Sequence, residues 1–219
     1  MKVVVLLSGG MDSSVALWHC LAEGHEVIAC LGVHYGSKHN ACELPMAKWQ
    51  AEKAGVPFQT ADLSVMNELF KSSLLLSGDE IPEGHYEEES MKSTVVPFRN
   101  GILLSLAAGF AESLSAEGLV IAAHSGDHAI YPDCREDFLS PMAQAISAGT
   151  YENLSLLRPF VDLRKEDIAK RGYELGIDFK HTWSCYKGGD THCGVCGTCT
   201  ERKEAFIIAQ IEDPTPYLS

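Results

Sequence analysis

Short apolar runs alternate along this chain with longer segments in which apolar residues recur at helical spacing. The short runs predict four β-strands, at Lys2–Leu7, Glu26–Val33, Pro57–Leu63 and Gly118–Ala123. The longer segments predict helices at Ser13–Ala22, Ala41–Ala54, Asn100–Ser115, Asp137–Ala148 and Arg164–Leu175. Strands that alternate with helices are typical of an α/β fold, so we expect an open, mainly parallel sheet with helices on both faces.

The first predicted strand runs directly into the string Ser8-Gly9-Gly10-Met11-Asp12-Ser13-Ser14. Unpaired backbone N–H groups at the start of the following helix, together with the helix dipole, favour a phosphate or pyrophosphate there. The glycines let the backbone approach such an anion, and the serine hydroxyls can donate hydrogen bonds to its oxygens. The string therefore predicts a nucleotide-binding loop, although it has neither the Gly-Lys-Ser/Thr of a Walker loop nor a Gly-x-Gly-x-x-Gly spacing.

Three polar loops follow predicted strands, at Ser8–Ser13, His34–Lys38 and His124–Asp137. Ligands of open parallel sheets bind beyond the carboxyl ends of the strands. We therefore expect these three loops to converge on one crevice.

Charge and composition narrow the choice of partners. The net charge of −13 argues against direct binding of nucleic acid, because phosphate contacts need clustered Lys and Arg. The apolar start is too short for a signal peptide, and no run approaches the roughly 18 apolar residues of a membrane span, so we expect a cytoplasmic chain with no membrane partner. Eight cysteines in that compartment indicate metal binding or catalysis before disulfides.

Four of the cysteines form a C-x7-C-x2-C-x2-C pattern near the end of the chain: Cys185, Cys193, Cys196 and Cys199. Thiolates on a glycine-rich knuckle suit tetrahedral Zn²⁺ in a closed structural site, while an iron–sulfur cluster remains the alternative that thiolate count leaves open. We predict an ATP-binding α/β domain at 1–180 and a zinc-binding region at 181–219, which a helix at Glu201–Ile211 packs onto the domain. Cys20, Cys30 and Cys42 fall on strand or helix patterns and are expected to be buried.

Two strings in the middle of the chain carry further chemistry. In Val96-Pro97-Phe98-Arg99-Asn100, Arg99 falls at the positive end of a predicted helix, a cost that a bound anion would cancel, while Asn100 could equally be a plain N-cap. The long loop after the fourth strand brings together Asp127, Tyr131, Asp133, Cys134 and Arg135, with Cys134 expected to be a packing residue.

The segment Ser77–Lys92 contains glycines and a proline but no periodicity, and six acidic residues lie between Asp79 and Glu89. It is either an active-site lid or a surface loop without a role.

The glycine string resembles the pyrophosphate-binding loop of the ATP pyrophosphatases that adenylate their substrates. Together with Val96–Asn100, Tyr131-Pro132-Asp133-Cys134-Arg135 and the four-cysteine tail, it makes nearly the whole chain resemble the 7-cyano-7-deazaguanine synthases of the queuosine pathway. The resemblance implies an adenine nucleotide alpha hydrolase-like, Rossmann-like fold. Phe98 departs from the glycine expected there, and His124–His128 departs from an acidic, Ser/Tyr-rich loop, which puts details of substrate contact in doubt.

The resemblance also implies a reaction: 7-carboxy-7-deazaguanine, ammonia and ATP give a nitrile through an adenylated carboxylate and an amide. It implies that pyrophosphate is held by the loop residues Leu7, Ser8, Gly9, Gly10, Met11, Asp12, Ser13, Ser14, Val15, Ala16 and Leu17, with Asp12 positioning Mg²⁺. The implied catalytic residues are Asp12, Arg99, Asp127 and Asp133, and the implied substrate contacts are Arg99, Asn100, Tyr131, Asp133 and Arg135. Asp127 or His128 would relay protons, and Lys38 or His34 would assist near the nucleotide.

Two alternatives of different kinds are weighed against this interpretation. A tRNA thiolase shares the adenylating loop but needs a basic RNA surface and a free catalytic cysteine pair, neither of which this chain offers. A non-catalytic nucleotide- or zinc-dependent assembly module would show no turnover with any substrate. The small molecules are the expected partners, and the resemblance makes a homodimer plausible.

Overall fold

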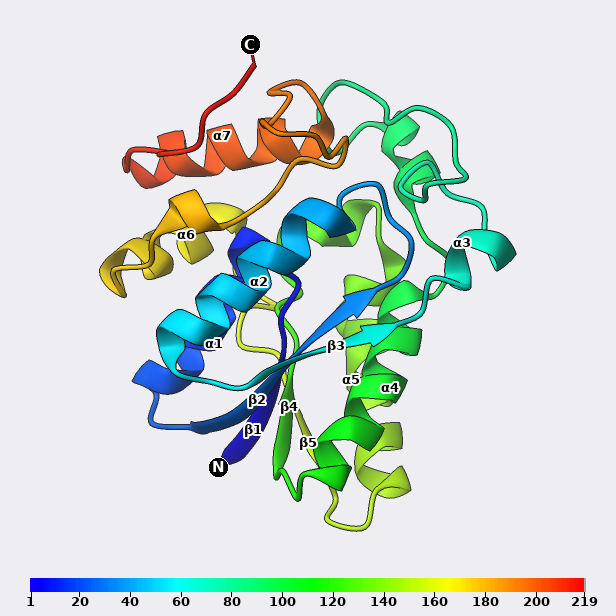
Figure 1. The fold of residues 1–219 in the computed structure, drawn as a ribbon, viewed down its shortest axis with the longest axis vertical. Coiled ribbons are helices and arrows are strands. Elements are labelled where there is room, and N and C mark those ends of the chain that lie inside the picture. The colour runs from blue at the N-terminus through cyan, green and yellow to red at the C-terminus, as the bar shows by residue number, and fades with distance from the viewer. Residues whose placement is uncertain (219) are drawn as a thin grey trace.

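A parallel sheet of five strands, in the order β3-β2-β1-β4-β5, forms the centre of the computed structural model, which describes residues 1–218 apart from the side chain of His128 (Figure 1). The strands are β1 (Lys2–Leu6), β2 (Glu26–His34), β3 (Phe58–Asp62), β4 (Gly118–Val120) and β5 (Ser155–Leu157). All four pairings are parallel, and Val5 of β1 lies opposite both Cys30 and Val120. The predicted fold class is confirmed. The strand β5 was not predicted, because three residues are too few to show a period.

Helices cover both faces of the sheet (Figure 1). One face carries α1 (Met11–Ala22) and α2 (Asn40–Ala54). The helix α6 (Lys165–Glu174) packs on α1, and α7 (Gly197–Ala209) packs on α6, and apolar residues of all four helices share one buried cluster with β1. The opposite face carries α4 (Arg99–Ser113) and α5 (Glu136–Gly149), which bury a second cluster against β1, β2 and β4. A short helix, α3 (Met66–Leu69), follows β3. The sheet is therefore buried on both sides, as parallel sheets are.

Several element boundaries differ from the predicted ones. The helix α1 begins at Met11 and not at Ser13, and β4 ends at Val120, three residues before the predicted end. The last helix begins at Gly197, four residues before the predicted start, because the chain turns into helix immediately after Cys196. Hydrophobic periodicity locates the middle of an element far better than its ends.

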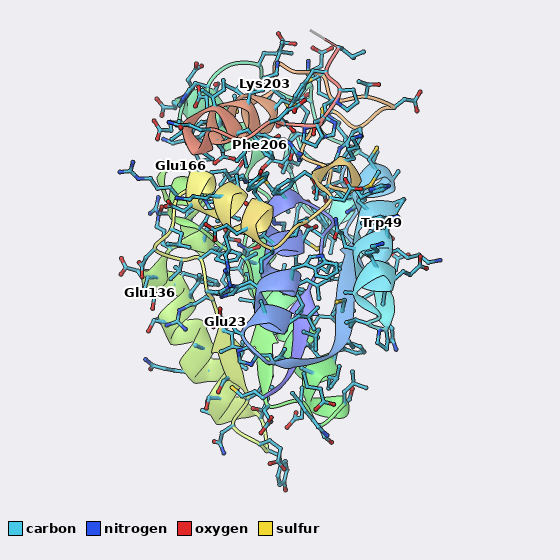
Figure 2. All side chains as sticks on the ribbon, turned by 90° about the vertical axis from the view of Figure 1, so that its left-hand side faces the viewer. Glu23, Trp49, Glu136, Glu166, Lys203 and Phe206 are labelled. Atoms are coloured by element: carbon cyan, nitrogen blue, oxygen red, sulfur yellow. The ribbon has the colours of Figure 1, made fainter. Side chains whose placement is uncertain are left out.

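The segment that carries the cysteine pattern is joined to the body of the protein by α7 and a buried arginine. Arg202 has no exposed surface, and its guanidinium donates to the Thr182 hydroxyl at 2.8 Å and to the Phe179 carbonyl oxygen at 3.2 Å. It also pairs with Asp213 at 3.2 Å. Figure 2 shows α7 lying above α6, with Phe206 on its inner side, where that ring is 2% exposed. Three stretches of the C-terminal region are thus tied together through one buried charge.

One stretch, Glu89–Ser113, is long and apolar enough to span a membrane by length and composition alone. In the structure it is a 3-10 segment, Glu89–Thr94, followed by a break and then α4. At about 1.5 Å per residue, α4 is shorter than a membrane's hydrocarbon core. Its residues Leu104, Ala107 and Ala111 are buried in the second core cluster, so α4 is a core helix.

The residue that starts α4, Phe98, has a left-handed backbone, with φ of +53°. A β-carbon on the facing Gly101 would lie 2.3 Å from the Phe98 ring, so the missing side chain makes room for this ring. The ring also meets the edge of Phe138 at a centroid distance of 5.5 Å. A residue with a β-carbon is strained in this conformation by about 1 kcal/mol, and the strain sits directly before Arg99.

Replacing Phe98 by glycine or by alanine removes the same ring contacts. The two variants differ only in whether the residue at this positive φ carries a β-carbon. We expect Phe98→Gly to be more stable than Phe98→Ala by about 1 kcal/mol, because only glycine adopts a positive φ without strain. Urea unfolding of the two variants measures the difference. Equal stabilities would show that the left-handed backbone at this position carries no strain.

Candidate functional site

A cavity of about 220 Å³ lies beyond the carboxyl ends of β1, β2 and β4, at the place where the strand order reverses. This is the location predicted from the three polar loops, and each of them lines it. The loop after β1 contributes Ser8 and Asp12, the loop after β2 contributes Tyr35 and His39, and the loop after β4 contributes Asp127 and Tyr131. Further segments add Arg99, Lys165 and Trp183 to the wall, and α2 and α7 add Glu43 and Glu201.

The glycine loop is held in place by close backbone approaches. Gly9 has a φ of +92°, and a β-carbon there would lie 2.1 Å from the backbone oxygen of Glu43 in α2. The Gly9 carbonyl accepts a hydrogen bond from the Trp183 N–H at 2.9 Å. The hydroxyls of Ser8 and Ser13 lie 3.0 Å apart across the turn. Gly9 thus lets α2 and the segment before the cysteines close on the loop from two sides.

The eleven residues predicted to hold the nucleotide divide into three groups. Those whose atoms line the cavity are Leu7, Ser8, Gly10, Met11, Asp12 and Ser13. Gly9 and Ser14 shape the loop, since the Ser14 hydroxyl donates to the Gly10 carbonyl at 2.8 Å. The remaining three, Val15, Ala16 and Leu17, are fully buried in the core on the inner side of α1. The string therefore contains both contact residues and the helix that supports them.

One wall of the cavity is a cluster of charges around Lys165. Its ammonium donates to Asp12 Oδ2 at 2.6 Å and lies 3.4 Å from Glu201 Oε2 and 3.3 Å from His124 Nε2. Burial opposes ionisation of Asp12, but Lys165 and His124 outweigh it and hold the pKa of Asp12 below its ordinary value. Burial prevails for Glu201, whose pKa is raised. Asp12 Oδ1 is buried without a hydrogen-bond partner among the described residues, which leaves that oxygen free for a ligand.

A further carboxyl of the cavity lining, that of Glu43 in α2, lies outside the Lys165 cluster. Its Oε2 lies 3.6 Å from His39 Nε2, which also contacts the Tyr35 hydroxyl at 3.2 Å. Burial raises the pKa of Glu43 to about 8; Arg99 partly offsets this and Asp12 adds to it. Burial and the nearby Arg99 lower the pKa of His39 to about 3, so this imidazole is neutral near pH 7. Arg99 itself donates to the Tyr35 hydroxyl at 3.4 Å.

The residues predicted to contact the substrate have different surroundings. Tyr131 lines the cavity, and its hydroxyl lies 2.7 Å from Thr94 Oγ1 and 3.3 Å from the Tyr186 hydroxyl. Asn100 also lines it, but Asp133 is turned to α4, where its Oδ2 accepts the Asn100 backbone N–H at 2.8 Å. Asp133 is therefore the side chain that caps α4, a role that the sequence assigned to Asn100 as the alternative.

Three predicted positions lie away from the described cavity lining. Arg135 is exposed, directly before α5, and donates to the Ala129 carbonyl at 3.4 Å. Lys38 donates to the Ser73 and Gly78 carbonyls at 2.9 and 3.1 Å, so it anchors a neighbouring loop and does not face the nucleotide loop. His34 pairs with Asp62 of β3 at 3.6 Å.

The His128 side chain lies outside the part that the structure describes. Cys134 is buried and accepts from the Asn100 amide at 3.2 Å, consistent with packing.

The segment Ser77–Lys92 is docked on the cysteine region. The Gly84 N–H donates to the Val195 carbonyl at 3.2 Å, and Lys187 pairs with Glu83 at 2.5 Å. Met91 is 2% exposed and contacts the start of α7 at Gly197. The acidic segment therefore has a packed inner side, which composition alone did not indicate.

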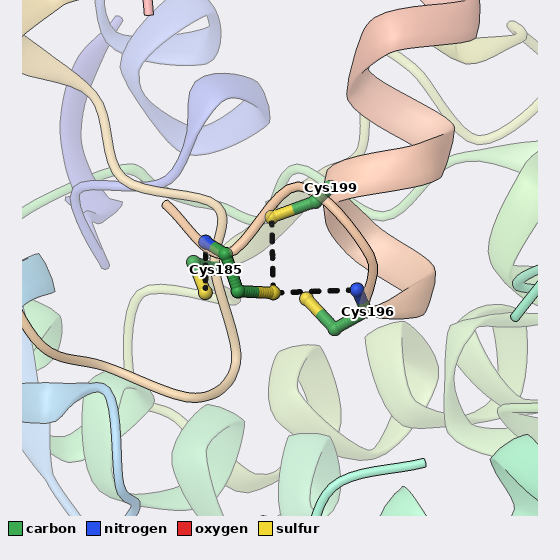
Figure 3. Close-up of side chains that lie close together, drawn as sticks. Cys185, Cys196 and Cys199 are labelled. Atoms are coloured by element: carbon green, nitrogen blue, oxygen red, sulfur yellow. Dashed lines mark hydrogen bonds between the residues drawn. The ribbon is translucent and has the colours of Figure 1, made fainter. Parts of the chain in front are cut away.

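The four cysteines of the C-terminal pattern converge on one point (Figure 3). Their sulfur atoms all lie within 4.8 Å of one another, and those of Cys193 and Cys199 are 4.0 Å apart. Thiolates around one tetrahedral ion with 2.3 Å bonds lie about 3.8 Å apart. The Cys196 N–H points at the Cys193 sulfur at 3.3 Å, and hydrogen bonds from Cys185 and Cys199 lower the pKa of the Cys196 thiol. The cluster can hold a metal ion.

Several residues of the cavity were missed by sequence reasoning: Tyr35, His39, Glu43, Lys165, Tyr186 and Glu201. His39 and Glu43 are four residues apart at the start of α2, so they share a face of the helix, and this spacing was a usable signal. Lys165 and Glu201 come from α6 and α7, whose approach to the glycine loop only the fold reveals.

The chain has an α/β fold with a parallel sheet, a glycine loop after its first strand and a cavity where the strand order reverses. Among solved structures, the U34-tRNA thiolase NcsA from Methanococcus maripaludis, described with its [4Fe-4S] cluster, matches with a TM-score of 0.53 at 14% identity, covering 96% of this chain and 64% of that one. A predicted subunit of tRNA methyltransferase from Methanocaldococcus jannaschii matches with a TM-score of 0.51 at 15% identity, over 80% and 74% of the chains. These likenesses show the fold alone.

The family model described as "Queuosine biosynthesis protein QueC" matches residues 2–210, and the chain belongs to this family. Curated relatives named 7-cyano-7-deazaguanine synthase include one from Porphyromonas gingivalis, 53% identical over 98% of this chain and 96% of its own. Those from Desulfotalea psychrophila and Methanoregula boonei are 50% and 49% identical and cover 98% and 99% of both chains. The resemblance inferred from the motifs is thereby confirmed.

The raised pKa of Glu43 has a consequence for stability. The folded state holds this proton up to about pH 8, while the unfolded chain releases it near its ordinary pKa of about 4.3. The stability that the protonated carboxyl contributes is complete below the lower value and is lost as the pH rises through the higher one. We expect Glu43→Gln to gain stability relative to the parent across this window, by up to about 1 kcal/mol per pH unit.

Urea unfolding at several pH values measures this difference. Glu52→Gln is the matched control, because Glu52 lies on the same helix with its side chain 64% exposed. A stability difference for Glu43→Gln that does not change with pH would contradict the raised pKa.

Proposed function

We propose that this protein is an ATP-dependent ligase that converts 7-carboxy-7-deazaguanine and ammonia into 7-cyano-7-deazaguanine in queuosine biosynthesis. Its family and the names of relatives about 50% identical over the whole chain support this activity. The observation that carries the chemistry is the single cavity in which the glycine loop, Arg99 and Tyr131 meet. Such a cavity has room for an anion at one end and an aromatic substrate at the other.

The reaction needs ATP because a carboxylate is a poor electrophile. In the first step the carboxylate oxygen attacks the α-phosphate, and pyrophosphate leaves. Ammonia then displaces AMP to give the amide. The amide oxygen is adenylated in turn, and its departure as AMP leaves the nitrile. Each activation is followed by loss of a diphosphate, which the backbone N–H groups at the start of α1 would stabilise.

We assign roles to residues on both sides of the cavity. Ser8, Gly10 and Ser13 would bind the pyrophosphate, and Arg99 would offset the charge that develops on the α-phosphate. Asp12, whose Oδ1 has no partner, would hold Mg²⁺, which neutralises phosphate charge when bound. Tyr131 would stack on the bicyclic base, and Asp127 would relay protons.

The other assigned residues lie at or next to the starts of helices. Asn100 would contact the substrate from the start of α4, while Asp133 would serve this site by capping that helix. A contact from Arg135 requires that its exposed side chain turn inward when substrate binds.

We propose that the four-cysteine cluster holds one structural Zn²⁺. All four corners of the tetrahedron are thiolates, so no position is left for an activated water. Thiolates that bind a four-iron cluster sit on separate iron atoms and therefore lie further apart than thiolates that share one ion, which favours zinc at the observed spacing. The zinc-binding region would comprise residues 181–219 and the ATP-binding domain residues 1–180.

The remaining assignments concern partners and location. The net charge of −13 supports small molecules as the partners and no direct contact with nucleic acid. We propose a cytoplasmic protein that takes free ammonia, and the family resemblance favours a homodimer.

Incubation with ATP, Mg²⁺, ammonium and 7-carboxy-7-deazaguanine tests the proposal. Mass spectrometry should detect the nitrile, and ion-exchange chromatography should detect AMP and pyrophosphate, because cleavage at the α-phosphate produces both. Omission of the deazaguanine acid is the control and should abolish nucleotide consumption. Formation of ADP would refute the adenylate, and a protein that consumes ATP for no deazaguanine acid would refute the function.

Replacing one zinc ligand tests the metal assignment. We expect Cys196→Ser to lose the metal and to be destabilised by several kcal/mol, because a structural zinc site contributes its binding energy to folding. Metal analysis and thermal unfolding measure the two effects. Cys42→Ser is the control, since the Cys42 thiol is outside the cluster and contacts the Gly189 carbonyl. A Cys196→Ser protein that is metal-free, inactive and as stable as the parent would contradict a structural role.

A further inference from the structure

Building a nitrile from a carboxylate releases protons as well as phosphates. When ammonia attacks the acyl-adenylate, the C–N bond forms, the bond to AMP breaks with its electron pair, and nitrogen sheds one proton. When the amide oxygen takes up AMP, nitrogen sheds a second proton. The last N–H proton leaves as the C–O bond breaks and the triple bond forms. A base near the reacting carbon is therefore needed three times for each nitrile.

We propose that the Glu43 carboxylate is the base that accepts these N–H protons, an inference that rests on the proposed function. Its position supports this. Glu43 lines the cavity, and its Oε1 lies 3.7 Å from the point where a side chain on Gly10 would begin. Gly10 belongs to the loop proposed to bind pyrophosphate, and Arg99, proposed to offset charge on the α-phosphate, lines the same cavity. Glu43 is therefore part of the wall around the space where the reacting carbon must lie.

The charged groups around Glu43 leave its carboxylate able to accept a proton. The one ion-pair partner within 4 Å of it in the described part of the chain is His39, which is neutral near pH 7. Arg99 from α4 favours the carboxylate, and Asp12 from α1 opposes it. The Tyr35 hydroxyl approaches from the loop after β2, and the tilted ring of Tyr186 lies beyond His39 at a centroid distance of 5.3 Å. Among the described residues, no lysine or arginine forms an ion pair with Glu43.

The other carboxyls of the cavity are less suited to this task. Asp12 is held ionised by Lys165, with a pKa below its ordinary value, which makes it a weak base. Glu201 shares the same lysine. Asp127 also lines the cavity and pairs with His124 at 3.4 Å, and its proposed relay role is to pass protons on after Glu43 has accepted them. The raised pKa of Glu43, about 8, makes it a stronger base that is still partly ionised near neutral pH. A general base works best when its pKa is close to the working pH.

The conversion of the amide to the nitrile isolates this role, because that step needs ATP but no ammonia, and so the ionisation of ammonium does not enter. We expect Glu43→Gln to slow nitrile formation from 7-amido-7-deazaguanine by about 100-fold or more, the usual contribution of a general base. The parent rate should rise with pH up to about pH 8 and then level. The glutamine variant should lack this rise, and Glu43→Asp should recover part of both.

A second measurement separates the base from a nucleotide ligand. Exchange of labelled pyrophosphate into ATP, driven by 7-carboxy-7-deazaguanine, reports adenylation without any N–H bond. In Glu43→Gln this exchange should stay within about threefold of the parent while nitrile formation falls, since adenylation of the acid, unlike adenylation of the amide, removes no proton from nitrogen. Glu52→Gln, the exposed control on the same helix, should match the parent in both assays.

Three outcomes would overturn the inference. Unchanged nitrile formation in Glu43→Gln would show that no proton passes to this residue. Parallel loss of exchange and nitrile formation would assign Glu43 to nucleotide binding, and recovery of both by added Mg²⁺ would assign it to a metal ion. If the parent protein makes no nitrile from either the acid or the amide, the proposed function itself fails, which is a different result from any of these.

Discussion

The closure of three chain segments around Gly9 is the constraint on which the rest of the site depends. The backbone of Glu43 passes where a side chain on Gly9 would stand, and the Trp183 N–H bonds to the Gly9 carbonyl. The first contact brings α2 over the nucleotide loop, and the second brings in the segment that leads to the cysteines. Because the first contact needs a residue without a β-carbon, glycine here determines how closely α2 approaches the loop as well as the shape of the loop.

The carboxyls of the cavity have two different electrostatic surroundings. On one side Lys165 balances Asp12 and Glu201, so negative charge is already compensated before a phosphate arrives. On the other side Glu43 stands beside a neutral His39, so its charge depends on pH. Two carboxyls of similar chemistry thus have opposite pKa shifts, an arrangement that lets one hold an ion while the other exchanges protons. Trp183 and Glu201, which flank the cysteine pattern in the sequence, also line this cavity, so the cysteine region is part of its wall.

Much of this arrangement could be predicted from the sequence, because it depends on local patterns. The strand, glycine turn and helix at Val3–Leu17, and the cysteine spacing, are contiguous signals, and the parallel sheet and the position of the crevice follow from the order of elements. Lys165 and Glu201 could not be assigned in this way, and Glu43 had only its spacing from His39 as a signal. Each lies on a helix, where a charged residue normally faces solvent, and only tertiary packing turns it inward. Asp133 shows the converse. It belongs to a distinctive motif and was expected to contact substrate, but its carboxylate accepts the Asn100 backbone N–H and so caps α4.

The central claim is that ATP is cleaved at its α-phosphate so that the oxygens of the acid leave as part of AMP. The most direct measurement uses 7-carboxy-7-deazaguanine labelled with oxygen-18 in both carboxylate oxygens, followed by mass spectrometry of the nucleotide products. The account predicts labelled AMP, two molecules for each nitrile formed, with no label in pyrophosphate. Label recovered in inorganic phosphate or in water would contradict it.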